Sequence, residues 1–285
     1  MNNVSIMSAE QKLAWAKVMP NTALWELKMP GKKLVIKDSA GLFRAVRPEG
    51  ELVIISMRDG RITEEPWVVY GEQDEALLNR HFSWVLPGQE HILCMLWHML
   101  GVIKIPELRS FYFAVLSDDE LMERFYRAKA SHHHHHNYEG GLLEHSYQVA
   151  SSAASMGRQY KLGHTSECIC FLGGLLHDLG KVRLFYNDSH QGVCGQHEAF
   201  TLMILAKPLE DLRRLKPNLF EALASVFTAK VGRHQPQYLP ETFVRLCDRL
   251  STEVSRCRQA FEGMPDYFWY AKSELDDRVY KRLDT

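Results

Sequence analysis

Six side chains of the kinds that bind divalent metal ions recur in a fixed order along the second half of the chain. They are His145, His177, Asp178, His197, His234 and Asp248. The adjacent histidine and aspartate end an apolar run and are followed closely by Gly180 and Lys181. A helix interior gains little from two neighbouring polar ligands, whereas imidazole and carboxylate together suit ions such as Mn, Fe, Ni or Mg. The pattern therefore predicts a metal site, and such a site favours metal-assisted hydrolysis of a phosphate ester.

Each of these residues also has an ordinary structural role open to it. An isolated histidine such as His145 is more often a helix-start or surface residue than a metal ligand. Asp248 lies close in sequence to Arg245 and Arg249, with which it could form a solvated ion pair. Asp211 is a weaker competitor for the last ligand position. The ordered recurrence of six ligands favours the metal site over these separate explanations.

Composition limits the class of protein. The 285 residues carry 34 Lys and Arg against 35 Asp and Glu, so no overall basic field indicates nucleic-acid binding, although one channel could still be locally basic. The six cysteines show neither disulfide-framework spacing nor a CxxC zinc pair, so we expect reduced thiols and no disulfide-linked partner. The longest apolar stretch, 92–103, is too short to span a bilayer. With no signal peptide recognised, a soluble cytoplasmic protein without a membrane partner is expected.

The first quarter of the chain has a β-rich pattern after one short helix. That helix is expected at residues 8–19, with Ser8 as its cap. Short runs of β-branched and aromatic residues follow at 34–36, 42–46, 52–55 and 67–70. The dipeptide Asp59-Gly60 lies between two of these runs and predicts a tight hairpin. Residues 22–71 are therefore expected to form a small antiparallel sheet or a partial barrel.

From residue 72 onward the strand patterns give way to helical ones. Helices are expected at 89–103, 106–116, 118–130, 142–160, 166–179, 196–206, 218–230 and 240–262. The predicted fold class is α+β, with a mainly α-helical body preceded by a small antiparallel β module. We divide the chain into a β-rich module with a leading helix (1–75), a helical connector (76–117) and a helical domain (118–285).

The helical body resembles the HD superfamily of metal-dependent phosphohydrolases over about residues 118–260. The resemblance rests on Gly-Gly-Leu-Leu-Glu-His at 140–145, on His-Asp-Leu-Gly-Lys at 177–181, and on an aspartate in a late helix. It implies that one metal ion is bound by His145, His177, Asp178 and Asp248. Members with two ions add two histidines between the His-Asp pair and the final aspartate. His197 and His234 lie in that interval here. Asp178 would then bridge the two ions.

Residues 135–145 narrow the resemblance further. They are similar to a segment of the bacterial 3′-to-5′ exoribonucleases that carry an OB-fold before the HD domain, and of the HD-containing relaxases of conjugative elements. The exoribonuclease pattern has two adjacent histidines where this chain has His234 and Gln235. The resemblance implies a phosphodiesterase, of the 3′-5′ exonuclease type, that acts on single-stranded nucleic acid and needs divalent metal, with two ions expected.

Asp178 and Lys181 are the expected catalytic residues. Two cations close together lower the pKa of a shared water and polarise phosphoryl oxygens. A carboxylate has two oxygens with which to bridge them, and a lysine three residues later could place its charge against a phosphate oxygen.

Candidate substrate contacts flank the predicted metal site. They are His135, His136, Tyr138, Arg183, Lys230 and Arg233. Tyr138 could stack on a base, worth about 1–3 kcal/mol, and core packing is an equal alternative for it. Within the run of five histidines at 132–136, we expect the last two near the mouth of the site and the first three in solvent.

Two other functions stay open at this point. An HD hydrolase of free nucleotides would need a closed pocket with groups that read the base. A non-catalytic accessory module of a conjugation or mobile-element system would keep the ligands for structure and hydrolyse nothing. The sequence does not choose between RNA and DNA, identify the metal or give the oligomeric state.

Overall fold

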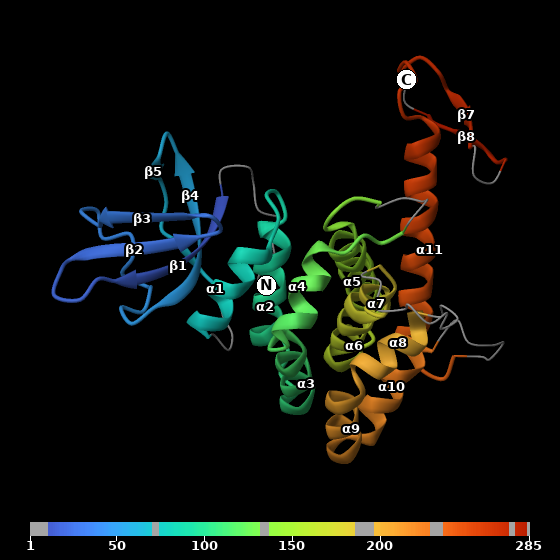
Figure 1. Cartoon of the computed structure of the whole chain (residues 1–285), viewed down its shortest axis with the longest axis horizontal. Coiled ribbons are helices and arrows are strands. Elements are labelled where there is room, and N and C mark those ends of the chain that lie inside the picture. Colours follow the sequence, from blue (N-terminus) through green and yellow to red (C-terminus); the bar gives the residue numbers. More distant parts are fainter. Residues whose placement is uncertain are drawn as a thin grey trace. The chain divides into compact units, whose positions relative to one another are not determined.

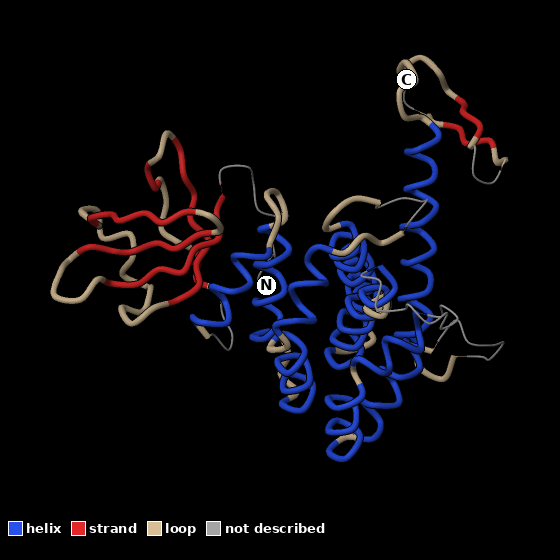
Figure 2. The backbone as a smooth tube through the Cα atoms, viewed as in Figure 1, coloured by secondary structure: helices blue, strands red, loops and turns tan. Residues whose placement is uncertain are grey.

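The computed structural model describes residues 11–69, 74–131, 137–185, 197–228, 236–273 and 277–283. The chain divides into two compact units, Met1–Arg127 and Ala128–Thr285 (Figure 1). The first combines an antiparallel sheet with helices, and the second is mainly helical (Figure 2). The predicted α+β class with a helical body is confirmed.

The first unit is built on an antiparallel sheet. Its strands are β1 (Gln11–Val18), β2 (Leu24–Met29), β3 (Lys32–Lys37), β4 (Glu51–Arg58), β5 (Arg61–Ile62) and β6 (Trp67–Val68). They are ordered β3-β2-β1-β4-β5, and β6 also pairs with β4. The helices of this unit are α1 (Glu75–Trp84), α2 (Glu90–Val102), α3 (Pro106–Leu116) and α4 (Asp119–Arg127).

The predicted leading helix at 8–19 is wrong, because residues 11–18 form the central strand β1. This strand pairs with β2 on one edge and with β4 on the other. The consecutive side chains of Leu13, Ala14, Trp15 and Ala16 are all buried. A strand covered on both faces has no polar alternation along it, so its pattern is easily mistaken for that of a helix. The predicted cap, Ser8, lies outside the described residues.

The predicted strand at 42–46 is also wrong, and this segment forms turns between β3 and β4. The carboxylate of Asp38 accepts hydrogen bonds from the backbone N–H groups of Leu42 and Phe43, at 2.7 and 2.9 Å. This side chain satisfies the backbone locally, so no strand partner is needed. The Phe43 ring stacks on Trp25 with centroids 4.9 Å apart.

The predicted Asp59-Gly60 hairpin is confirmed. Arg58 of β4 pairs with Arg61 of β5, which leaves a two-residue loop. Both loop residues have positive φ, 49° at Asp59 and 74° at Gly60, as a type I′ turn requires.

The second unit consists of helices and one short hairpin. Its elements are α5 (Gly141–Gln159), α6 (His164–Leu176), α7 (Lys181–Phe185), α8 (His197–Ile204), α9 (Ala206–Leu215), α10 (Pro217–Phe227), α11 (Leu239–Ala260), β7 (Tyr270–Lys272) and β8 (Val279–Lys281). Helices α5 and α6 pack along one another, and α11 packs against both. The helix expected at 118–130 is α4, which packs with α1 and α3 in the first unit.

None of the helices in the described part of the chain combines the length and apolar character that a bilayer span requires. Five cysteines lie in that part, and all are free thiols. Burial raises the pKa of Cys94, Cys168 and Cys170 to about 12, which keeps these thiols protonated and unreactive.

Two adjacent glycines let α6 approach its neighbours closely. A Cβ at Gly174 would lie 2.7 Å from the Cα of Ala150 in α5, which is closer than side chains pack. A Cβ at Gly173 would lie 3.0 Å from Cγ1 of Val226 in α10. The backbones of α5 and α6 are therefore in direct contact along the turn of α6 that precedes His177.

We predict that Gly174→Ala destabilises the second unit by about 1–3 kcal/mol, because the new methyl group overlaps the α5 backbone. The matched control is Gly157→Ala in α5, where a Cβ would lie 3.5 Å from its nearest neighbour, Cys170 Sγ. The control should be neutral or more stable by up to about 1 kcal/mol, since alanine is the better helix former. Urea unfolding followed by circular dichroism measures both. Equal stability of the two variants would contradict the close contact.

Candidate metal centre

Three helices of the second unit bring four ligand-type side chains together. His145 lies in α5, His177 and Asp178 directly follow α6, and Asp248 lies in the middle of α11. Their ligand atoms all lie within 4.8 Å of one another. The first three side chains are buried and Asp248 is partly exposed. This is the arrangement that a single bound metal ion requires.

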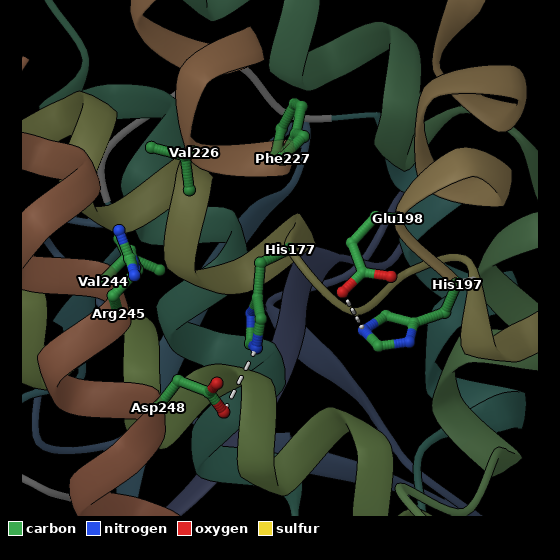
Figure 3. A pocket seen from close by; sticks show the side chains of 8 residues that line it. All are labelled: His177, His197, Glu198, Val226, Phe227, Val244, Arg245 and Asp248. Atoms are coloured by element: carbon green, nitrogen blue, oxygen red, sulfur yellow. Dashed lines mark ion pairs between the residues drawn. The ribbon is translucent and has the colours of Figure 1, made fainter. Parts of the chain in front are cut away.

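The two carboxylates converge on the two imidazole nitrogens. Asp178 Oδ2 lies 3.4 Å from His145 Nε2 and 3.3 Å from His177 Nε2. Asp248 Oδ1 lies 3.3 and 3.6 Å from the same two nitrogens. Figure 3 shows the contact between His177 and Asp248.

Hydrogen bonds on the far side of each ring fix which nitrogen faces the cluster. His177 Nδ1 lies 2.7 Å from the carbonyl oxygen of Gly174, which accepts only, so Nδ1 carries the proton. His145 Nδ1 lies 3.2 Å from Ser251 Oγ, whose hydroxyl donates to Gln148 Oε1 at 3.4 Å. Since that hydroxyl proton is engaged, Ser251 accepts from Nδ1. In the neutral rings both Nε2 atoms therefore present a lone pair to the cluster, as metal-binding histidines do.

The buried polar atoms of the cluster have ion-pair neighbours but no aligned hydrogen bond. His177 Nε2, Asp178 Oδ1 and His197 Nε2 are all buried without a hydrogen-bond partner. Buried polar atoms without such partners are rare in proteins because they cost free energy. A divalent cation would satisfy them, and the mixed nitrogen and oxygen donors fit Mn, Fe, Ni or Mg.

Opposite charges dominate the electrostatics of the site. Burial by itself would raise the pKa of Asp178, but the charges of His177 and Lys181 and the contacts with His145 and His177 lower this pKa well below its usual range. Burial would likewise lower the pKa of His177, but Asp178 and Asp248 outweigh it and raise this pKa to about 9. In the metal-free protein, a protonated His177 therefore takes the place of a cation.

The other two residues near Asp178 approach it from different sides. Lys181 Nζ lies 2.6 Å from Asp178 Oδ2, so its charge is engaged with that carboxylate in this structure. His197 is the first residue of α8, and its Nε2 lies 2.9 Å from Asp178 Oδ1.

The start of α8 is fixed to the turn that follows the His-Asp pair. The Gly180 N–H donates to Thr201 Oγ1 at 2.8 Å, and this hydroxyl lies 3.3 and 3.0 Å from the carbonyl oxygens of His177 and His197. A Cβ at Gly180 would overlap the His197 carbonyl oxygen. Gly180 and the fully buried Thr201 thus hold His197 against Asp178.

A small pocket of about 20 Å³ opens beside the cluster, and three apolar side chains are among its lining. Its polar lining residues are His177, His197, Glu198, Arg245 and Asp248 (Figure 3). This volume is enough for a water molecule.

The remaining candidates do not all fall in the described part of the chain. His135, His136, Lys230, Arg233 and His234 lie outside the described residues. Tyr138 is 45% exposed, and its hydroxyl donates to Glu144 Oε2 at 2.8 Å. Arg183 is exposed in α7.

Four residues near the site were missed from the sequence. Gln148 and Ser251 lie three residues after His145 and Asp248, on the same helix faces, and this spacing is a usable signal. Thr201 and Glu198 carry no such signal, because only the folding of α8 onto the turn brings them to the site.

Residues 142–253 match the family model of the HD domain. Over these residues the chain is similar to HD domains. The match confirms the predicted resemblance, and it implies a metal-dependent phosphohydrolase. Residues 79–184 match a second family model, TraI_2, described as "Putative helicase". No curated protein and no solved structure matches the chain significantly.

We predict that the metal-free protein loses stability as the pH rises from about 6.5 to 9. The pKa of His177 is raised to about 9 in the folded chain, against 6.5 for an unperturbed histidine. The stabilisation is therefore complete below pH 6.5 and is lost as the folded protein deprotonates, by at most about 3 kcal/mol. Urea unfolding in the presence of a chelator, repeated across this range, measures the loss. His177→Gln should make the free energy of unfolding nearly independent of pH in this range. An unchanged pH dependence in that variant would show that His177 is not its cause.

Proposed function

We propose that this chain is a divalent-metal-dependent phosphodiesterase that hydrolyses single-stranded nucleic acid from its 3′ end. One observation carries the proposal: two buried imidazole nitrogens and two carboxylates converge within the region that matches the HD domain, and a bound cation would satisfy the buried polar atoms among them. The alternative of a surface ion pair for Asp248 is disfavoured, because its carboxylate faces both histidines.

Two metal ions fit the proposal. The first would be held by His145, His177, Asp178 and Asp248, and the second by His197 and His234, with Asp178 shared. The metal supplies a water of lowered pKa and positive charge beside the phosphoryl oxygens. Manganese is the ion that we would test first.

The chain's own residues prepare the site. Gly174 and Ser251 hold the two rings with Nε2 toward the carboxylates. Lys181 balances the charge of Asp178 until substrate arrives, and a short movement of its flexible stem would bring the ammonium to a phosphate oxygen.

Nucleic acid is the proposed substrate for two reasons. Residues 135–145 are similar to a segment of nucleic-acid-processing HD proteins. The TraI_2 match, whose description is that of a helicase, covers residues 79–184 and so includes His145 and the His-Asp pair. The proposed substrate contacts remain His135, His136, Tyr138, Arg183, Lys230 and Arg233.

The proposed organisation places the catalytic HD domain at 118–285, after a substrate-guiding β module at 1–75 and a connector at 76–117. The buried free thiols support a reducing compartment, and we propose the cytoplasm.

We predict that Asp178→Asn abolishes hydrolysis and bound metal together, because the amide neither bridges cations nor carries charge. The helical circular dichroism should persist. Asp211→Asn is the matched control, since this aspartate is exposed on α9 of the same unit, and it should keep full activity. Metal content by mass spectrometry and turnover are measured on the same samples. Hydrolysis that survives in Asp178→Asn would overturn the site.

A second prediction concerns the substrate. With Mn²⁺, end-labelled single-stranded oligonucleotides should shorten stepwise from the 3′ end, and mononucleotides should remain intact. RNA and DNA are compared at equal length. Turnover of mononucleotides alone would replace the proposal by a nucleotidase. No turnover of any substrate by the metal-loaded protein would replace it by a non-catalytic accessory module.

A further inference from the structure

We propose that Glu198 is a ligand of the second metal ion, together with His197 and Asp178. The inference rests on the proposed function, because it needs the metal site, and it adds a carboxylate that the family resemblance does not supply.

The two oxygens of Asp178 face different groups. Oδ2 faces His145, His177 and Lys181. Oδ1 lies 2.9 Å from His197 Nε2 and has no hydrogen-bond partner, although Asp178 is only 1% exposed. A buried carboxylate oxygen that points away from the first ligand group marks a second position beside α8.

Glu198 reaches the same position. Its Oε1 lies 3.3 Å from His197 Nε2 (Figure 3). The same nitrogen also contacts Asp178. Glu198 is 9% exposed and lines the pocket beside His177 and Asp248. The imidazole nitrogen thus has carboxylate oxygens of two residues within 3.3 Å, and no aligned hydrogen bond joins it to either.

The sequence position of Glu198 makes this convergence unusual. Consecutive residues of a helix point in different directions and do not normally face each other. Here the side chains of His197 and Glu198 turn toward one point at the start of α8, where Thr201 fixes the backbone. An acidic residue in the first turn of a helix is favourable in any case, but that role is fulfilled at the surface and does not require burial.

The donor types indicate which ion would bind here. Two carboxylate oxygens and one imidazole nitrogen form a harder ligand set than histidines alone. Such a set favours Mn²⁺ or Mg²⁺ over softer ions. A carboxylate in this position would also reduce the net positive charge of a two-ion centre.

Calorimetric titration of Mn²⁺ into the chelator-treated full-length chain tests the inference. The wild type should bind two ions. Glu198→Gln removes the charge but keeps the shape and hydrogen-bonding capacity of the side chain. It should weaken the affinity for the second ion at least about 10-fold and leave the affinity for the first ion unchanged. Glu262→Gln, at an exposed position of the same unit, is the control and should match the wild type.

Electron paramagnetic resonance of the same samples separates ligation from a structural effect. At two equivalents of Mn²⁺, the wild type should show the signal of two coupled ions. Glu198→Gln should show only isolated Mn²⁺, with urea stability close to that of the control. Should Glu198→Gln not fold, Glu198→Asp serves instead. This shorter carboxylate should give intermediate affinity for the second ion.

The outcomes distinguish the inference from the proposed function. A wild type that binds no metal would overturn both. A wild type that binds two ions, with the same two affinities in Glu198→Gln, would overturn the Glu198 assignment and leave the metal-dependent function intact. A wild type with a single binding site would also overturn the assignment.

Discussion

The carboxylate of Asp178 is almost completely buried, and the local structure of the second unit depends on compensating its charge. Removing a carboxylate from water costs several kcal/mol even after relaxation. Three imidazole nitrogens and one ammonium lie within 3.4 Å of its two oxygens. They come from α5, the end of α6, α7 and α8, so four separate segments must be positioned together around one side chain.

That positioning requires backbones to approach more closely than side chains allow. Gly174 brings α6 into contact with the α5 backbone beside Ala150, one turn after His145. Gly180 allows the turn after the His-Asp pair to meet the first residue of α8. The hydroxyl of Thr201 then joins the two backbones by hydrogen bonds. The two glycines on either side of the pair are therefore as much part of the site as the ligands.

The sequence predicts which ligand-type side chains lie together, because their chemistry is concentrated in few residue types. An adjacent His177 and Asp178 at the end of an apolar helix has little structural purpose without a metal, and the family model of the HD domain matches around it. The long helices were predictable for a related reason, since their apolar periodicity extends over several turns.

The sequence predicts poorly what depends on tertiary contacts. Strand β1 looked helical because both of its faces are covered, and the segment 42–46 looked like a strand although Asp38 satisfies its backbone. Glu198 escaped notice because an acidic residue at a helix start is ordinary in sequence. Only the approach of α8 to Asp178 shows that this carboxylate is buried beside His197.

The protonation of His177 connects the metal-free and metal-bound forms of the site. Without a metal ion, the two carboxylates attract a proton to this ring, because Lys181 alone does not balance both negative charges. A metal ion would bind the lone pair of the same nitrogen, so metal binding must release that proton. With His177 protonated or with metal bound, positive charge faces both carboxylates in addition to that of Lys181. This explains how the buried carboxylate of Asp178 is tolerated before a metal has bound.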